Sequence, residues 1–503
     1  MQEYQPETHF NTSLGYGPLT VMLRFLLVSL SIDAILGEIT VYQRRKKLEE
    51  MTKGDGLGDA YTATLSRIKA QNRSRSRLGM QALMWVSHSE RPLRVAELRH
   101  ALGVEEGSTD LNTQNIPAIE TLLACCLGLI TVEKSSSTVR LVHYTLQEYL
   151  SRNPNLFPKP HSTIGEVCLT YLNFRQVRSI SPTLHSVPPT VPFAEYASCH
   201  WGTHAGRETT ESLKRLALQL LDGFDKHISS KVLLLREMGI WGRHIYWGDS
   251  FRGFTGLHGA AYFGCLEIIV ALLDMGKWDT RATDCHGNTA IAWAARRGHG
   301  ETVRILLDRN EVNPDTTDEY GRTLLSCAAQ NGHEGVVRIL LERNDVNPNT
   351  ASKYGETPLS WAAENGHEEV VRILLERNDV NPDTADKYGQ TPLWRAAQNG
   401  YERVLRILLQ RSDVNPDTAD TLFGQTPLSR AAENGHEGVV RILLERNDVN
   451  PSTADILLGQ TPLSRAAQSG HEGVVKILRE RSDVNPNKPK KTWPNTSHEL
   501  RRI

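Results

Sequence analysis

The sequence is short of the features that mark secreted or nucleic-acid-binding chains. Its 503 residues include only 7 cysteines, an odd number at irregular spacing. Such a set forms no disulfide framework and is typical of a protein in a reducing intracellular compartment. An excess of charge of one sign is also lacking, because 57 Lys and Arg are balanced by 58 Asp and Glu. This balance argues against binding of nucleic acid by the chain as a whole.

Long hydrophobic runs are missing as well. The most apolar stretch, residues 21–37, contains Arg24 and Asp33, whereas a membrane span needs about 20 almost uncharged residues. The residues before it include Glu3 and Glu7 but no Lys or Arg, unlike a secretory signal. We therefore interpret the stretch as a buried helix and expect no membrane partner. The expected location is cytoplasmic, with a nuclear one as the alternative.

Several catalytic motifs are absent. No Gly-x-x-x-x-Gly-Lys-Ser/Thr string occurs, and the glycine-rich segment that begins at Gly54 has no lysine after it, so no phosphate-binding loop is expected. His-Glu pairs recur at residues 333, 367, 436 and 471, but the zinc-protease motif needs a second histidine four residues on, where valines stand. No Gly-x-Ser-x-Gly occurs either. We expect no enzymatic activity and no cofactor.

One group of residues could hold a metal ion. Cys199, His200 and His204 would supply three ligands, but the sequence suggests no fourth and has no Cys-x-x-Cys pair. We favour the interpretation that these three side chains are buried and have a structural role, and we expect no metal site.

The second half of the chain consists of an internal repeat. Seven related units begin at threonines spaced by 34 or 35 residues, and seven glycines keep the same register: Thr255, Thr289, Thr323, Thr357, Thr391, Thr426 and Thr461; Gly264, Gly298, Gly332, Gly366, Gly400, Gly435 and Gly470. A fixed period of this length is typical of a solenoid, in which each unit packs only on its neighbours.

Each unit predicts two helices and a loop. In the unit at residues 357–390, Thr357 can cap a helix and the proline after it suits the first helical position. Gly366 ends this helix in a left-handed conformation. A second helix follows, with an apolar set too broad for a helix that faces solvent on most sides. Residues 379–390, which contain a proline and a glycine, form the connecting loop, or finger.

This unit resembles the ankyrin repeat, over residues 251–487. The family's Thr-Pro-Leu-His keeps its histidine only at His258, and the last two fingers each carry one extra residue. The array also shows its end, because Arg479 stands where earlier units have leucine. A polar residue there suits a terminal unit whose outer face meets water.

Residues 77–150 predict a small α+β unit. Helices are expected near residues 78–86, from Pro92 to Leu102 and from Ile116 to Leu127. A hairpin at residues 129–142 and a helix at residues 143–150 follow. Three helices with a β wing resemble a winged helix.

Several sequence strings in this region resemble those of fungal NACHT proteins. The strings that carry the resemblance are Leu57-Gly-Asp-Ala-Tyr, Arg91-Pro-Leu-Arg-Val-Ala-Glu-Leu, Cys126-Leu-Gly-Leu and Val139-Arg-Leu-Val-His-Tyr-Thr-Leu-Gln-Glu-Tyr-Leu, with Phe25-Leu-Leu-Val-Ser-Leu as the end of a NACHT module. In that family a winged helix, also likened to one in GPI inositol-deacylases, lies between the nucleotide-binding domain and ankyrin repeats. The resemblance implies a NACHT-type, NLR-like protein without its phosphate-binding part. It places His143 where the family's histidine approaches nucleotide, but without the rest of that site a structural role is favoured.

DNA binding by the winged helix is not expected. Its candidate recognition helix, at residues 116–127, has Glu120 and no basic residue, whereas contacts to phosphates need Lys or Arg. The basic run Arg73, Arg75 and Arg77 precedes the domain and is interpreted as a solvated linker.

The predicted fold class is mainly α, an ankyrin solenoid preceded by a small winged-helix domain and a helical connector. The expected boundaries are a NACHT remnant at 1–75, the winged helix at 76–152, the connector at 153–250, seven repeats at 251–487 and a basic tail at 488–503. The predicted function is non-enzymatic binding of partner proteins through the repeats, in NLR-like self/non-self or signalling responses. The alternative is a fragment of a NACHT-type NTPase switch.

A partner is expected at the finger tips and at the exposed ends of the first helices, the places where the units differ. The candidate residues are Tyr320, Tyr354, Lys387, Tyr388 and Phe423 in the fingers, and Arg296, Arg297, Glu364, Gln398 and Glu433 at the helix ends. The finger aromatics have a second interpretation, in which they only pack one finger against the next.

Overall fold

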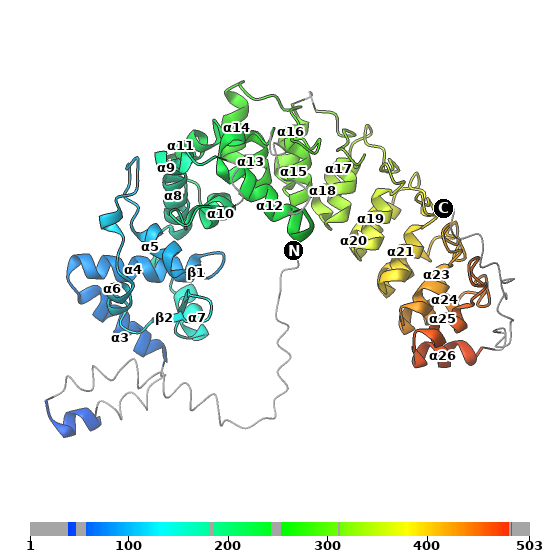
Figure 1. The fold of residues 1–503 in the computed structure, drawn as a ribbon, viewed down its shortest axis with the longest axis horizontal. Helices are drawn as coiled ribbons and strands as arrows, with labels where there is room; N and C mark the ends of the chain where they lie inside the picture. The colour runs from blue at the N-terminus through cyan, green and yellow to red at the C-terminus, as the bar shows by residue number, and fades with distance from the viewer. Residues whose placement is uncertain are drawn as a thin grey trace, which may run out of the picture. The chain divides into compact units, whose positions relative to one another are not determined.

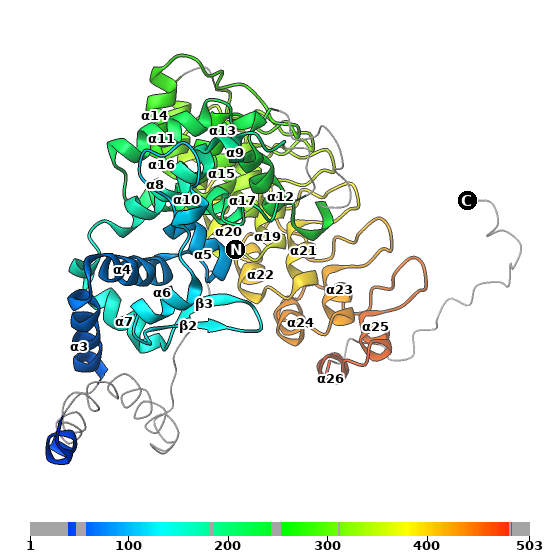
Figure 2. The same cartoon turned by 60° about the vertical axis from the view of Figure 1, so that its left-hand side comes forward.

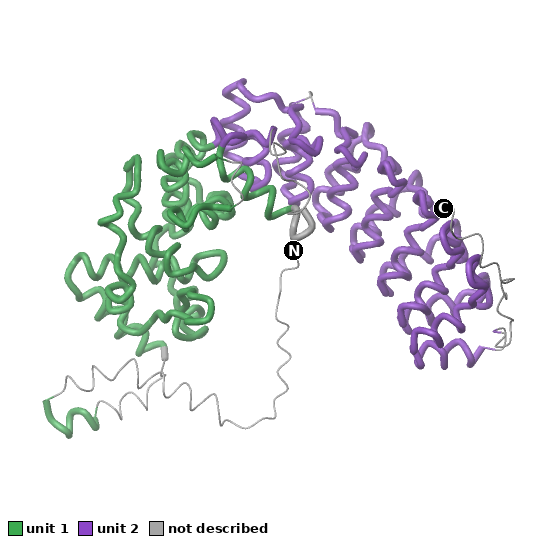
Figure 3. The backbone as a smooth tube through the Cα atoms, viewed as in Figure 1, with its two compact units in different colours: residues 1–220, 227–237 green, residues 221–226, 238–503 purple. Residues whose placement is uncertain are grey.

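The computed structural model describes residues 39–46, 57–181, 186–242, 253–309, 312–481 and 484. The chain divides into two compact units, residues 1–220 with 227–237 and residues 221–226 with 238–503 (Figure 3). The apolar stretch at 21–37 and the basic tail lie outside the described residues. Within the described part of the chain, no helix is long and apolar enough to span a lipid bilayer.

The first unit begins with the predicted winged helix. Its elements are α3 (Leu57–Ala70), α4 (Arg73–His88), β1 (Leu93–Arg94), α5 (Val95–Leu102), η1 (Thr113–Asn115), α6 (Ile119–Cys125), β2 (Ile130–Glu133), β3 (Thr138–Leu141) and α7 (Tyr144–Arg152). The sheet is antiparallel in the order β1-β3-β2, with Val139 of β3 opposite both Leu93 and Val132. A small helical domain with a β wing is therefore present, as the sequence predicts.

Two sequence expectations for this region need correction. The helix expected from Pro92 starts only at Val95, because Leu93 and Arg94 pair with β3 as a short strand. The basic run at residues 73–77 is no linker: it forms the first turns of α4, which Asn72 caps by accepting the N–H of Arg75. Helix α4 thus continues across the boundary expected between residues 75 and 76.

A helical segment completes the first unit. It comprises η2 (Pro154–Leu156), α8 (Pro160–Asn173), α9 (Arg175–Arg178), α10 (Ala194–Arg207), α11 (Glu211–Leu221) and most of α12 (Ile228–Gly242). The short η3 (Phe224–Lys226), between α11 and α12, belongs to the second unit. The core of the helical segment is aromatic: the ring of Phe193 lies 5.5 Å from that of Trp85 and 5.1 Å from that of Tyr171. These contacts join α10 to α4 of the winged helix and to α8, so the two parts of the unit share one core.

The second unit is a stack of helix pairs. The pairs are α13 (Gly256–Phe263) with α14 (Leu266–Asp274), α15 (Ala290–Arg297) with α16 (Gly300–Leu307), α17 (Leu324–Gln330) with α18 (Glu334–Leu341), α19 (Pro358–Glu364) with α20 (Glu368–Leu375), α21 (Pro392–Asn399) with α22 (Glu402–Leu408), α23 (Pro427–Glu433) with α24 (Glu437–Leu444), and α25 (Pro462–Gln468) with α26 (Glu472–Arg479). Within this unit the pairs follow one another along a curved array, and the fingers project on one side (Figures 1 and 2).

The local rules read from one unit hold in the structure. The hydroxyl of Thr357 accepts the N–H of Ser360 and so caps α19. Gly366 ends that helix with φ +75°, and a Cβ there would lie 2.7 Å from the ring of Tyr401. Only glycine avoids both the left-handed strain and this clash.

Candidate protein-binding surface

Each finger turn is held by an acidic or hydroxyl side chain at the base of the finger. In the finger at residues 386–390, one carboxylate oxygen of Asp386 accepts the backbone N–H groups of Tyr388 (2.8 Å) and Gln390 (2.9 Å). Asp318 does the same for Tyr320 and Arg322, each at 2.9 Å. Such Asx turns fix the backbone of the tip locally, before any contact with another unit.

Backbone hydrogen bonds join successive tips. The carbonyl oxygen of a tip residue accepts the N–H of the next finger, and the pairs are His286–Glu319 (2.9 Å), Tyr320–Lys353 (2.8 Å), Tyr354–Lys387 (2.8 Å), Tyr388–Thr421 (2.7 Å) and Phe423–Ile456 (2.9 Å). We call this series the finger ladder. It needs the backbone of each tip residue but not its side chain.

The aromatic side chains of the tips face outward. Tyr320 is 38%, Tyr354 47%, Tyr388 42% and Phe423 44% exposed. Burying large apolar side chains normally stabilises a protein, so a row of rings left in water is a feature of interaction surfaces. We call these four residues the tip row.

Cations lie over two of the tip rings. The ammonium group of Lys387 is 5.6 Å from the ring centroid of Tyr354, and the guanidinium of Arg322 is 5.1 Å from that of Tyr320. Both contacts are cation–π pairs; Lys387 is exposed, whereas Arg322 is half-buried. Lys387, a predicted site residue, thus belongs to the same surface as the tyrosines and adds positive charge to it.

The predicted helix-end arginines are engaged within the array. The guanidinium of Arg296 lies 5.1 Å from the centroid of Trp293 and donates to Asn288 Oδ1 at 3.2 Å. Arg297 stacks over Tyr262 at 4.8 Å. Both side chains are half-buried, so they contribute packing between units as well as charge at the surface.

Two acidic residues of the predicted site also have partners in neighbouring units. Glu364 accepts a hydrogen bond from Arg395, while Glu433 accepts from Arg465 Nη1 at 3.0 Å and from Gln425 at 2.9 Å. Burial disfavours the ionised Glu433, but its hydrogen bonds from Gln425 and Arg430 and the charge of Arg465 outweigh that effect and lower its pKa. Both carboxylates are half-buried, and they join adjacent repeats.

Gln398 marks another junction between units. Its backbone carbonyl accepts Nε2–H of His436 at 2.9 Å and the amide of Asn434 at 2.8 Å. His299, His333, His367 and His471 make the same bond to a carbonyl of the preceding unit, at 2.8–3.0 Å. The recurring His-Glu pairs therefore have a structural role, since their histidines connect the repeats.

The structure adds exposed apolar residues that the sequence analysis did not select as site residues. Leu422 is exposed beside Phe423, and Ile456, Leu457 and Leu458 are exposed together on the last finger. The sequence already indicated this exposed apolar surface, because each of these two fingers has one extra residue and contains a short apolar run.

His143 has a structural partner in the first unit. Its Nδ1 accepts the N–H of Thr145 at 3.3 Å and lies 2.8 Å from the Thr145 hydroxyl, which is 2.8 Å from the hydroxyl of Tyr61. His143 is thus the N-cap of α7 and helps to join α7 to α3.

Two family descriptions match parts of the chain. Ankyrin repeats, in three copies of the family unit, match residues 257–352, 344–420 and 412–489. The winged helix domain of GPI inositol-deacylase matches residues 65–164. Ankyrin repeats and a winged helix of this type are therefore present in the chain. Ankyrin arrays are typically protein-interaction modules without enzymatic activity, and no catalytic family is indicated.

A solved structure offers one further likeness. The ankyrin repeat domain of Bcl-3, described as a unique member of the IkappaB protein family, is 26% identical, with a TM-score of 0.38; the match covers 44% of this chain and 97% of that one. Among curated proteins the comparison found no match.

Proposed function

We propose that this protein binds a partner protein along the tip row, with Tyr354 and Tyr388 as the principal anchors. The observation that carries the proposal is the exposure of four aromatic tip side chains on fingers that their own backbones already hold together. Tyrosine offers a large contact area at a low entropic cost, and tyrosines are enriched among residues that dominate binding energy.

The alternative role for these rings, packing of finger on finger, finds less support. In the Asx turns the side chain at the finger base accepts tip N–H groups, and the finger ladder joins backbone groups, so neither needs the side chain of the tip residue. The helix-end residues Glu364 and Glu433 bind arginines of their own array. We therefore assign them to the rim of the surface, where they supply charge complementarity rather than anchoring.

An NLR-like setting is the finer part of the proposal. It is supported by the order of domains, a winged helix matched to the GPI inositol-deacylase type followed by ankyrin repeats. In this setting the array would recognise self or non-self proteins inside the cell and the first unit would relay the binding event.

The test compares affinities of a protein partner captured with the full-length chain. Tyr354→Ala combined with Tyr388→Ala should weaken binding by more than about 2 kcal/mol, or about 30-fold. The unfolding midpoint should change little, because both backbone carbonyls of the finger ladder remain. Binding is measured by calorimetry and stability by urea titration of the same preparations.

Tyr144→Ala is the matched control, since Tyr144 is also an exposed tyrosine but lies on α7 of the first unit. It should leave the affinity unchanged. A double variant that unfolds at lower urea and binds normally per folded molecule would favour the packing role. A stable double variant with undiminished affinity would place the partner elsewhere.

A further inference from the structure

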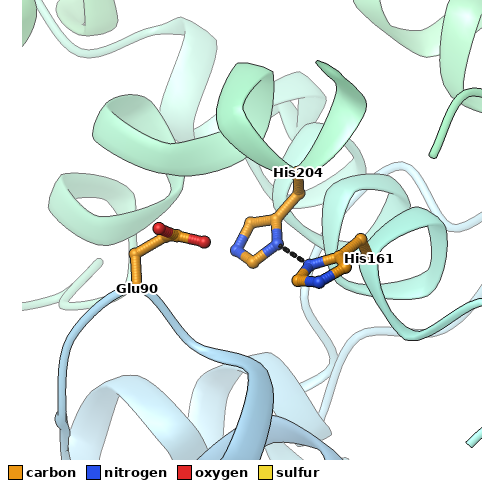
Figure 4. Close-up of side chains that lie close together, drawn as sticks. All are labelled: Glu90, His161 and His204. Atoms are coloured by element: carbon orange, nitrogen blue, oxygen red, sulfur yellow. Dashed lines mark hydrogen bonds between the residues drawn. The ribbon is translucent and has the colours of Figure 1, made fainter. Parts of the chain in front are cut away.

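Three polar side chains from separate segments meet inside the first unit. Glu90 follows α4, His161 is in the first turn of α8, and His204 is in the last turn of α10 (Figure 4). Helices α8 and α10 run antiparallel, because His161 at the start of one contacts His204 near the end of the other, while Tyr171 contacts Phe193 at the opposite ends. This packing brings the two histidines together although 43 residues separate them.

The geometry suits a metal ion. Nδ1 of His161 lies 2.9 Å from Nδ1 of His204, and one ligand atom from each of the three residues lies within 4.8 Å of the others. His204 is fully buried, and the other two residues are half-buried. The set therefore combines two imidazoles and one carboxylate with access from one side.

A neighbouring tyrosine orients the buried histidine. Nε2 of His204 is 3.1 Å from the hydroxyl of Tyr196, and that hydroxyl also accepts the backbone N–H of Glu90 at 3.1 Å. In the tautomer in which Nε2–H of His204 donates to the tyrosine oxygen, the Nδ1 lone pair of His204 points toward His161. Ligand histidines in metal sites are held in this way, by a hydrogen bond from the other ring nitrogen.

Arg207 is the competitor for the carboxylate. Its guanidinium donates to both oxygens of Glu90, one bond measuring 3.2 Å, and its side chain is exposed to solvent. A carboxylate has about four lone-pair sites, and Arg207 occupies two of them, so Glu90 would share its oxygens between Arg207 and an ion. The cation also opposes binding of a second positive charge nearby.

We propose that Glu90, His161 and His204 form a binding site for a divalent transition-metal ion, with zinc as the ion that fits best. Zn–N bonds of about 2.0–2.1 Å place two tetrahedral ligands about 3.4 Å apart. The two histidine nitrogens must therefore separate by about half an ångström as the ion takes the place of the Nδ1 proton of His161, and that ring changes tautomer to carry its proton on Nε2. The carboxylate turns inward as the third ligand, and water takes the fourth position. Mg²⁺ and Ca²⁺, which prefer all-oxygen ligands, fit poorly.

The test is titration of the chelator-treated, full-length chain with ZnCl₂ by calorimetry, with MgCl₂ as the comparison. A 1:1 site for zinc is expected, with zinc also raising the melting temperature. His161→Gln and Glu90→Gln should each weaken it at least tenfold. Arg207→Gln should tighten it severalfold, because it releases the carboxylate and removes a cation.

His100→Gln is the control, since His100 bonds to Tyr171 in the same unit but lies outside the cluster. It should leave the zinc affinity unchanged. Each variant is first checked for wild-type circular dichroism, and Glu90→Gln and Arg207→Gln keep the test decisive if a histidine variant does not fold. The proposal is overturned if zinc does not bind 1:1, if binding survives Glu90→Gln, or if Arg207→Gln has no effect. This inference is independent of the role proposed for the finger tips.

Discussion

At the scale of single residues, buried charges hold neighbouring repeats together. Arg395 is almost fully buried and donates to Asp386 at 2.5 Å and to Glu364 in the preceding unit. Asp386 in turn holds the finger turn at Tyr388. One guanidinium thus joins α21 to both the finger and the first helix of the unit before it.

Arg395→Met should therefore destabilise the chain strongly. It leaves the carboxylate of Asp386, whose side chain is 0% exposed, without its cation. Loss of one partner of a buried pair costs about 3–5 kcal/mol. The measurement is the urea midpoint of the full-length chain.

Arg343→Met is the control, since Arg343 follows α18 in the same array and pairs with the exposed Asp345. An exposed pair contributes about 0–1 kcal/mol, so this variant should unfold near the wild-type midpoint. Equal losses in the two variants would contradict the role given to burial.

Residue environments were the hardest feature to predict from sequence. Trp293 and Trp394 are only 3% and 2% exposed, although each carries an indole N–H that needs an acceptor. Each indole N–H finds an acceptor, Asp284 at 2.8 Å and the carbonyl of Gln425 at 2.9 Å. The helix-end charges similarly have partners 31 or 32 residues away, at Arg395 for Glu364 and at Arg465 for Glu433. Such pairs depend on how units stack, which the pattern of one unit does not contain.

At the scale of elements, the sequence predicts more, because the signals are local. A threonine cap, a glycine at positive φ and an apolar face recur within each unit, and they mark both helices. The end of the array is predictable too: Leu444 is buried, whereas Arg479, its counterpart in the last unit, is exposed. The short strand β1 was missed because its pairing with β3 is long-range.

A carboxylate placed between stacked helices tests the assigned helix faces. Ala397 of α21 is 0% exposed between neighbouring units, so Ala397→Glu should cost several kcal/mol, about 3 or more, as an unpaired buried charge. Ala467 of α25 holds the same position in the last unit and is exposed. Ala467→Glu should therefore have little effect on the denaturation midpoint.

This pair of variants is closely matched, because both place the same side chain on the same helix position. A midpoint unchanged by Ala397→Glu would show that the helix faces are assigned wrongly. A large loss at Ala467 would show that another surface covers the end of the array.

At the scale of the whole molecule, buried histidines predict sensitivity to acid. Burial lowers the pKa of His200 to about 3 and that of His227 to about 4, both in the first unit. They are neutral in the folded chain, whereas the unfolded chain takes up protons below about pH 6.5. Their stabilisation is complete above that pH and is lost as the pH falls from 6.5 toward 4.

The free energy of unfolding should fall on acidification in this window, by about 1.4 kcal/mol per pH unit for each group. His227→Gln removes one titrating group, while its amide can still donate to the carbonyl that His227 Nε2 contacts, Leu172 at 3.1 Å. This variant should show a shallower slope of stability against pH between 4 and 6.5. Identical slopes would mean that His227 does not titrate on unfolding.

In the first unit, residues that are far apart in the sequence come together in the fold, and the sequence alone does not predict such contacts. The metal ligands considered from sequence were Cys199, His200 and His204, which lie close together along the chain. In the structure, His204 contacts His161, and the ring of His200 lies 4.7 Å from that of Tyr196. Glu90 joins His161 and His204 from 71 or more residues away. Only the antiparallel packing of α8 and α10 creates this set.

The finger ladder makes the repeats interchangeable. Its hydrogen bonds use backbone groups that every unit has, and the histidine bonds between units also end on backbone carbonyls. If residues 357–390 were excised, Tyr354 would present to Thr421 the same carbonyl that Tyr388 presents now. A gene encoding such units can gain or lose them, or exchange their tips, while each junction stays compatible. The surface offered to partners can thus diversify much faster than the scaffold beneath it.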